Sequence, residues 1–193
     1  MRIKSLLISM TVVVGSGLLL AGCQSGDRAG RSEGSRAVRD GSLSSDANAA
    51  FRQLKAENPA AASLAASAKG VLVFPKIVKG GFVVGGFHGE GAMIKNGSTT
   101  GYYASSGGSY GLQAGLQTFS YALFFMTDED LTYLDNSAGW EVGVGPTITV
   151  VDKGVAGSLT TTSARSGVYC FFFDQKGLMA GLGIQGSKIT RID

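Results

Sequence analysis

The stretch GAMIKNGSTT, residues 91–100, contains the clearest turn signal in the chain. Asn-Gly is the dipeptide preferred in two-residue hairpin loops, because both central positions of that loop adopt positive φ. Strand-like segments flank the turn at 91–95 and at 98–104. The sequence therefore predicts a β-hairpin centred on Asn96 and Gly97.

Further strand signals lie on both sides of this hairpin. The apolar run 71–75 indicates a buried strand that ends at Pro75. Other strands are expected at 81–87, 111–126, 140–151, 167–173 and 178–185. Glycine makes up 30 of 193 residues, about twice the usual ~7%, and glycines within strands mark bends, bulges and close backbone approaches. We therefore expect a β-rich α+β domain with curved antiparallel sheets that could become barrel-like, and short N-terminal helices packed on one side.

Helix signals precede and interrupt the strands. Asp46 is a candidate cap for a helix through Leu54, and Asn58-Pro59 is typical of a new helix start, which Gly70 would end. A short helix is also expected from Asp128, as its cap, with two further acidic residues placing negative charge at the helix start. That interpretation is favoured over a calcium site, because the spaced ligand set is missing.

The N-terminus has the order of a bacterial export signal. Arg2 and Lys4 precede a mostly apolar run at 6–20, which is followed by Leu20-Ala21-Gly22-Cys23. This end resembles a lipobox, which implies cleavage before Cys23 and lipidation of its thiol. The alternative is a soluble secreted protein with a chance cysteine after the cut. The expected organisation is a signal peptide at 1–22, a lipidated cysteine and flexible tether at 23–44, and a domain at 45–193.

The composition of the expected mature chain limits its partners. Residues 24–44 are rich in Gly, Ser, Arg and Asp, so we expect a solvated flexible linker rather than an arginine contact with lipid headgroups. Without Arg2 and Lys4, the 17 Lys and Arg fall to 15, against 14 Asp and Glu. Such a chain has no net basic field for nucleic acid. By resemblance to other lipoproteins, Gln24 favours the outer membrane, facing the periplasm of a Gram-negative cell.

Three motifs suggest catalysis, and none has the parts it needs. The string GGSYG at 107–111 matches a nucleophile elbow, but the only histidine, His88, comes earlier in the chain. The string GLGIQG at 181–186 is followed by only seven residues, too few for a dinucleotide site. His88 and Glu90 match half of a zinc-deaminase signature and are expected instead to be a hydrogen-bonded pair. Cys170 is expected to be a buried, inert thiol. We therefore expect no enzyme activity, no catalytic residue, no metal and no cofactor.

Five glycine-containing strings occur in order along the chain: AKGVLVFPKIVKGG at 68–81, VGGFHGEG at 84–91, SYGLQAG at 109–115, GWEVG at 139–143 and KGLMAGL at 176–182, with GSKI behind them at 186–189. In this order and spacing they resemble the SYLF domain over residues 46–192. The resemblance implies a non-catalytic lipid-binding domain. Eukaryotic members of that family bind phosphoinositides, and some bind actin. For an exported lipoprotein actin is not an expected partner, and an anionic phospholipid such as phosphatidylglycerol replaces phosphoinositides.

Basic residues offer a mechanism for such binding. Lys69, Lys76 and Lys79 flank the apolar side chains at 74–78, which could insert into a membrane, while Lys188 and Arg191 could add to the same surface or form another. A lysine near an anionic bilayer contributes about 1 kcal/mol. The alternative for each lysine is that it only faces water beside a core strand. The expected function is a membrane-tethered lipoprotein that binds anionic headgroups; the alternative is a structural lipoprotein that docks another envelope protein.

Overall fold

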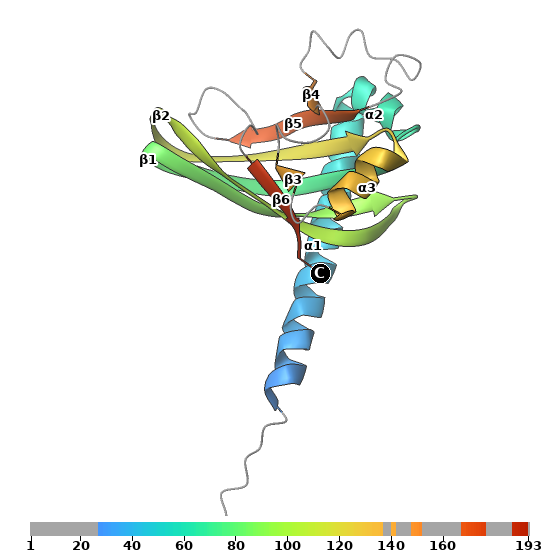
Figure 1. Ribbon diagram of the computed structural model, residues 1–193, viewed down its shortest axis with the longest axis horizontal. Helices are drawn as coiled ribbons and strands as arrows, with labels where there is room; N and C mark the ends of the chain where they lie inside the picture. Colours follow the sequence, from blue (N-terminus) through green and yellow to red (C-terminus); the bar gives the residue numbers. More distant parts are fainter. Residues whose placement is uncertain (1–26, 137–139, 142–147, 152–166, 177–186, 193) are drawn as a thin grey trace, which may run out of the picture.

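The computed structural model describes residues 27–136, 140–141, 148–151, 167–176 and 187–192 (Figure 1). These residues form three helices and one six-stranded sheet. The elements are α1 (Asp27–Glu57), α2 (Pro59–Ala65), β1 (Gly70–Lys95), β2 (Ser98–Phe125), α3 (Asp128–Asn136), β3 (Trp140–Glu141), β4 (Ile148–Val150), β5 (Val168–Lys176) and β6 (Ser187–Arg191). The expected β-rich α+β fold with a curved sheet is confirmed. The expected strand at 178–185 and Cys23 lie outside the described residues.

Strands β1 and β2 form one long antiparallel hairpin. Its loop is the predicted one, because Asn96 and Gly97 have φ of 50° and 78°, and Lys95 faces Ser98. The separate strands expected at 71–75, 81–87 and 91–95 are a single strand, and so are those expected at 98–104 and 111–126. Pro75 does not end β1. It lies at an irregularity of the ladder between Phe74 and Ile77, where its missing N–H removes no regular pairing.

Glycines allow β1 to bend back against itself. A Cβ on Gly81 would lie 2.2 Å from the Cα of Gly85, so this point of the bend has no room for a side chain. Further along, a Cβ on Gly89 would lie 2.4 Å from the carbonyl oxygen of Lys76. A Cβ on Gly91 would lie 2.6 Å from the carbonyl oxygen of Val73. The two halves of β1 therefore contact each other backbone to backbone, which closes the hairpin into a strongly curved sheet.

The remaining strands add to the two halves of β2. Strand β5 pairs with the half at Thr118–Phe125, and β6 pairs with the half at Tyr103–Gly107. Strand β3 then pairs with β6, and β4 with β5. The β4–β5 pair is parallel, whereas the other four strand pairs are antiparallel as expected.

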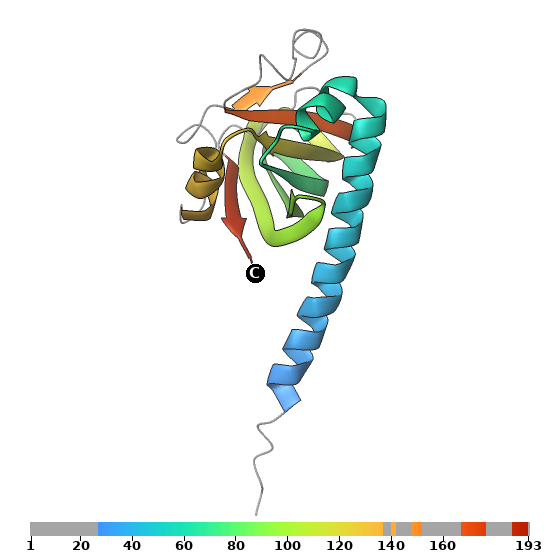
Figure 2. The same cartoon turned by 90° about the vertical axis from the view of Figure 1, so that its right-hand side faces the viewer.

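Two apolar clusters lie on the two faces of the curved sheet, and α1 and α3 are on opposite sides of it (Figure 2). The inner cluster packs side chains of the sheet against α3; its members include Phe74, Tyr121, Leu123, Leu131 and Ile189. The rings of Phe74 and Tyr121 stack with their centroids 4.6 Å apart. The outer cluster packs the other face against α1 and α2 through residues that include Leu54, Leu64, Val73, Phe124 and Phe171.

The structure has a helix where a flexible tether was expected at 23–44. Residues 27–44 belong to a helix of 31 residues, so the first N-terminal helix is long and does not start at Asp46. Its C-terminal part is fixed by burial of Ala47 and Leu54. Because adding residues to a formed helix costs far less than starting one, this packed part supports the extension towards Asp27.

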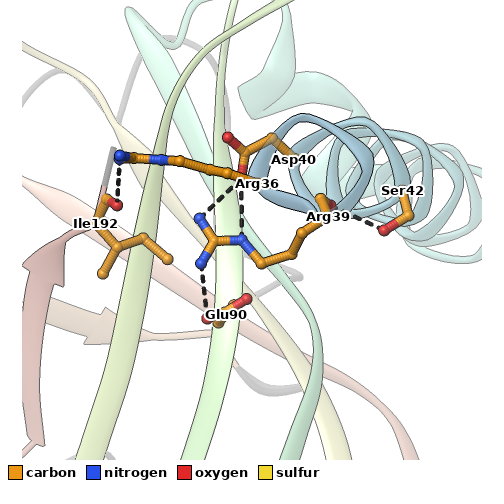
Figure 3. A network of polar contacts seen from close by, with 6 residues as sticks. All are labelled: Arg36, Arg39, Asp40, Ser42, Glu90 and Ile192. Carbon is orange, nitrogen blue, oxygen red and sulfur yellow. Dashed lines mark hydrogen bonds and ion pairs between the residues drawn. The ribbon is translucent and has the colours of Figure 1, made fainter. Parts of the chain in front are cut away.

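Polar contacts hold the middle of α1 to the sheet (Figure 3). The Arg36 guanidinium donates a hydrogen bond of 2.9 Å to the carbonyl of Ile192, next to β6. Arg39 lies 3.8 Å from the carboxylate of Glu90 on β1 and also donates to Asp40. The composition of residues 24–44 predicted a linker, because the residues that contact Arg36 and Arg39 are distant in sequence and local composition does not reveal them.

The caps of the shorter helices agree in part with the sequence. Asn58 Oδ1 accepts hydrogen bonds of 3.0 and 3.1 Å from the backbone N–H groups of Ala60 and Ala61, which confirms it as the cap of α2. At α3 the cap is Thr127 and not Asp128. Thr127 Oγ1 accepts from the Asp130 N–H at 3.2 Å, and its hydroxyl donates to the Asp130 carboxylate at 2.8 Å.

Candidate functional site

A pocket lies where the ladders on both sides of β2 are irregular. On one side, the pairing of β1 skips between Phe74 and Ile77; on the other, the pairing of β5 skips opposite 118–120. Asp174 of β5 has a φ of 48°, which is consistent with a local bulge. These departures from the regular ladder accompany a pocket of about 280 Å³, lined by Pro75, Lys76, Thr118, Phe119, Ser120, Asp174 and Lys176.

Two lysines from different strands contribute to this pocket. Lys76 comes from β1 and is exposed, and Lys176 comes from the end of β5 with 73% of its side chain exposed. The Lys176 ammonium lies 3.2 Å from a carboxylate oxygen of Asp174. The Ser120 hydroxyl donates a 2.7 Å hydrogen bond to the Pro75 carbonyl, which fixes β2 to the irregular segment of β1. With two ammonium groups and one carboxylate, the pocket has a formal excess of one positive charge.

Exposed apolar side chains adjoin the pocket on the same face. Lys176 is opposite Thr118 in the β2–β5 ladder, and Thr118 is opposite Val78 in the β1–β2 ladder, so the three share one row. Leu116, two residues from Thr118, points to the same face. Val78 is 40% exposed and Leu116 70% exposed. We call the face around Lys76, Val78, Leu116, Thr118 and Lys176 the outer tip. It combines cations with apolar side chains.

The other basic residues singled out from the sequence lie elsewhere. Lys79 alternates with Val78, points to the inner face and is only 8% exposed. Lys69 precedes β1 at its other end, 3.7 Å from the Asp128 carboxylate. Lys188 and Arg191 are exposed on β6, and Arg191 lies 3.6 Å from Asp135. Of the five, only Lys76 lines the pocket at the outer tip.

The apolar segment at 74–78 is also divided between the faces. Phe74 and Ile77 are fully buried, so the expectation that they could insert into a membrane is wrong. Among the described side chains near the bend, Val78 and Val84 are exposed; Val78 belongs to the outer tip, and Val84 is 64% exposed. Lys176 and Leu116 were not predicted as site residues. Neither strand alternates apolar and polar residues around these two positions, and only the register brings their side chains near Val78.

The groups considered for catalysis do not form a site among the described residues. Glu90 contacts Arg39 of α1 instead of forming the expected hydrogen-bonded pair with His88, which is exposed. Cys170 is a free, buried cysteine as predicted, and burial raises the pKa of its thiol. In the parts of the chain that the structure describes, no three potential ligand side chains converge as a metal site.

A second pocket lies at α3. It is a shallow depression of about 540 Å³, and its described lining residues are Asp128, Glu129, Thr132, Tyr133 and Asn136. Tyr133 is 39% exposed. The described part of its lining carries two carboxylates, those of Asp128 and Glu129, and Asp128 is paired with Lys69.

The comparisons with known proteins give no assignment. No family model matches the chain, and no curated protein matches it either. Within the described residues, none of the helices is both long and apolar enough to cross a bilayer. The resemblance to the SYLF domain and the function it implies therefore remain proposals.

Proposed function

We propose that this protein is a lipid-anchored, non-catalytic module of the bacterial cell envelope that binds anionic phospholipid headgroups through a basic surface. In this proposal Cys23 carries the lipid anchor and the outer tip is the headgroup-binding surface. The resemblance to the lipid-binding SYLF domain supports the proposal, and so does the lipobox-like sequence. The observation that carries it is the row of Lys176, Thr118 and Val78, with Leu116 and Lys76 beside it.

The chemistry of the outer tip suits an anionic membrane surface. Two lysines contribute about 1 kcal/mol each near an anionic bilayer. Asp174 reduces this contribution because it is paired with Lys176. Leu116 and Val78 are exposed and gain roughly 25 cal/mol for each Å² of apolar surface removed from water. The sum is a weak interaction, which suits a protein that is already held at a membrane.

The anchor and α1 would keep the outer tip close to a bilayer. The chain from Cys23 to Asp27 reaches at most about 14 Å. Helix α1 adds about 18 Å between Asp27 and Arg39, where it contacts the sheet. A surface confined to this range has a high effective concentration at the membrane, so weak headgroup affinity suffices.

Vesicle co-sedimentation of residues 24–193, which retain every described element, tests the proposal. We expect binding to vesicles that contain phosphatidylglycerol, weaker binding at higher salt because of screening, and no binding to neutral phosphatidylcholine vesicles. The double variant Lys76→Gln/Lys176→Gln should lose most of this binding. The control Arg52→Gln/Lys69→Gln removes the same charge away from the pocket and should retain it. Equal loss in both would contradict a site at the outer tip.

The second candidate is a structural lipoprotein that docks another envelope protein. The observation that favours it is the pocket at α3 with exposed Tyr133, because partly exposed aromatic residues often anchor interfaces. This candidate predicts that Tyr133→Ala abolishes capture of a defined envelope protein while leaving vesicle binding unchanged. If residues 24–193 bind no vesicles and Tyr133→Ala loses a partner, the docking function replaces headgroup binding.

A further inference from the structure

A third pocket lies where α1, α2 and the two ends of β1 come together. Helix α2 packs beside the C-terminal end of α1, on the side of the sheet opposite to α3 (Figure 2). The start of β1 lies beside its end, since a Cβ on Gly70 would be 3.3 Å from Lys95 Cγ. Between these elements is a pocket of about 440 Å³. Its size is within the range of small-molecule sites, about 300–1,000 Å³.

Small residues leave this pocket open, and buried residues form part of its wall. Five alanines and glycines belong to its described lining: Ala65, Ala66, Ala68, Gly70 and Gly97. Val71 and Ile94 also line it, and both are nearly fully buried members of the outer apolar cluster. The wall is therefore fixed by the packing of the core and does not depend on exposed side chains alone.

Two cations from α1 line the pocket. Arg52 and Lys55 are three positions apart on the helix, so their side chains are neighbours. The Lys55 ammonium lies 4.6 Å from the centroid of the Phe51 ring. That ring contacts the buried ring of Phe124 edge to face, with the centroids 5.9 Å apart. The ammonium is thereby held at the pocket wall by an aromatic side chain that is packed against the outer cluster.

These two positive charges have no acidic partner in the described parts of the chain. None of the ion pairs formed there involves Arg52 or Lys55. The described lining of the pocket contains no Asp or Glu, and the Asn96 side chain adds an amide N–H donor. The formal charge of this lining is therefore +2, which is complementary to a ligand with two negative charges.

The described lining favours a soluble ligand over a lipid in a bilayer. The large apolar side chains that are exposed in the described residues are Val38, Val78, Val84, Leu116, Tyr133 and Val150. None of them lines this pocket. Binding at a bilayer surface gains free energy from apolar side chains that leave water, and this lining offers no exposed one.

We propose that this pocket binds a soluble phosphate monoester. The Arg52 guanidinium can donate two parallel N–H hydrogen bonds to phosphate oxygens, and the Lys55 ammonium can donate a further charged one. A phosphate monoester carries about −1.5 to −2 charges at pH 7, which matches the two cations. The pocket is larger than one phosphate group, so the organic part of the ligand has room beside the alanines at 65–68. No residue of the outer tip lines this pocket, and so the inference does not rest on the proposed membrane binding.

Isothermal titration calorimetry of residues 24–193 with phenyl phosphate tests this inference. We expect one phenyl phosphate to bind per chain. Arg52→Gln/Lys55→Gln should bind it at least about tenfold more weakly, because a hydrogen bond to a charged group contributes about a factor of ten or more. The matched control Lys76→Gln/Lys176→Gln removes the same charge at the outer tip and should bind with unchanged affinity. Equal affinities of Arg52→Gln/Lys55→Gln and the unsubstituted chain would overturn the inference.

The single variant Arg52→Gln keeps the inference testable if the double variant does not fold. The Arg52 side chain is exposed and forms none of the ion pairs among the described residues, so its loss should leave the circular dichroism spectrum unchanged. This variant should bind phenyl phosphate about tenfold more weakly. Arg52→Lys, which retains the charge without the paired donors, should have an intermediate affinity. Unchanged affinity in Arg52→Gln would contradict a site at this pocket.

Two further ligands test the chemistry and the source of the phosphate. Methyl phenyl phosphate is a diester with a single negative charge, and we expect it to bind more weakly than phenyl phosphate; equal binding would overturn the assignment of a monoester. Phosphatidic acid carries a monoester headgroup. If Lys76→Gln/Lys176→Gln binds phosphatidic acid vesicles and Arg52→Gln/Lys55→Gln does not, a lipid headgroup replaces the soluble ligand.

The same variants separate this pocket from the outer tip. Arg52→Gln/Lys55→Gln should retain binding to phosphatidylglycerol vesicles, because phosphatidylglycerol is a phosphodiester and its proposed site is the outer tip. Lys76→Gln/Lys176→Gln should lose that binding and keep phenyl phosphate binding. Loss of phenyl phosphate binding in Lys76→Gln/Lys176→Gln alone would place the anion at the outer tip and contradict the site at Arg52 and Lys55.

Discussion

Substituting Gly91 by alanine tests how β1 closes the sheet. The added Cβ would lie 2.6 Å from the Val73 carbonyl oxygen and 2.6 Å from Phe74 Cδ1. Ordinary contacts of a Cβ begin near 3.4 Å, so the two halves of β1 must separate by most of an ångström. Phe74 is fully buried and stacked on Tyr121, so its ring cannot move aside without disturbing the inner cluster.

The expected cost of this substitution follows from two opposing effects. Overpacking a core costs about 1–3 kcal/mol, and more when backbone must move. Replacing glycine also stabilises the folded state by about 0.4–1 kcal/mol, because the unfolded chain loses freedom. We therefore expect Gly91→Ala to lower the free energy of unfolding by about 2 kcal/mol, and the melting temperature by about 4–8 °C for a domain of this size.

Urea and thermal unfolding followed by circular dichroism measure this effect. Gly108→Ala is the matched control, because a Cβ there would meet no heavy atom within 4 Å and Gly108 does not have positive φ. Its free energy of unfolding should change by no more than about 0.5 kcal/mol. If Gly91→Ala is as stable as Gly108→Ala, the close contact between the two halves of β1 is refuted.

Three further predictions concern the helix, a cap and the buried acids. Gly34→Ala should raise helicity and stabilise α1 by up to about 1 kcal/mol, because alanine favours helix over glycine and a Cβ there meets nothing within 4 Å. If residues 27–44 were a flexible tether, the helical circular dichroism signal would not increase. Asn58→Ala should cost about 1 kcal/mol in urea unfolding by leaving two N–H groups of α2 uncapped, and an unchanged midpoint would argue against the cap. Burial raises the pKa of the Cys170 thiol and the Tyr121 hydroxyl, so the folded state keeps protons that the unfolded state loses above about pH 8.5 and 10. The free energy of unfolding should fall by about 1.4 kcal/mol per pH unit for each group above these values. The Cys170→Ala variant should lack the part of this fall that comes from the thiol. Urea midpoints that do not change up to about pH 11 would contradict both pKa shifts.

The sequence predicted the local features of the fold better than its closure. Asn96-Gly97 and Asn58-Pro59 determine their turn and cap through their own backbone preferences, and the structure has both where expected. The bend of β1 depends on the close approach of Gly89 and Gly91 to the backbone of Lys76 and Val73. This is a tertiary contact, so local sequence preferences do not predict it. Pro75 was misinterpreted for the same reason, because the irregular pairing that accommodates it needs β2 opposite.

The candidate site shows a similar division. Lys76 was found because cations and apolar residues alternate near it, but the same reasoning included Lys79, which points to the other face. Lys176 is 100 residues away in sequence and reaches the pocket only through the register of β5 with β2. Residues 27–44 looked like a linker because the partners of Arg36 and Arg39 lie on distant strands.

The most direct test of the central claim places an environment-sensitive fluorophore at the outer tip. In residues 24–193 the only native cysteine is Cys170, which is buried, so Leu116→Cys and Tyr133→Cys can each be labelled selectively with a nitrobenzoxadiazole dye. We expect a blue shift and brighter emission for the label at position 116 with phosphatidylglycerol vesicles, and neither change with phosphatidylcholine vesicles or at position 133. A change at position 133 without one at position 116 would contradict headgroup binding at the outer tip and place the contact at α3.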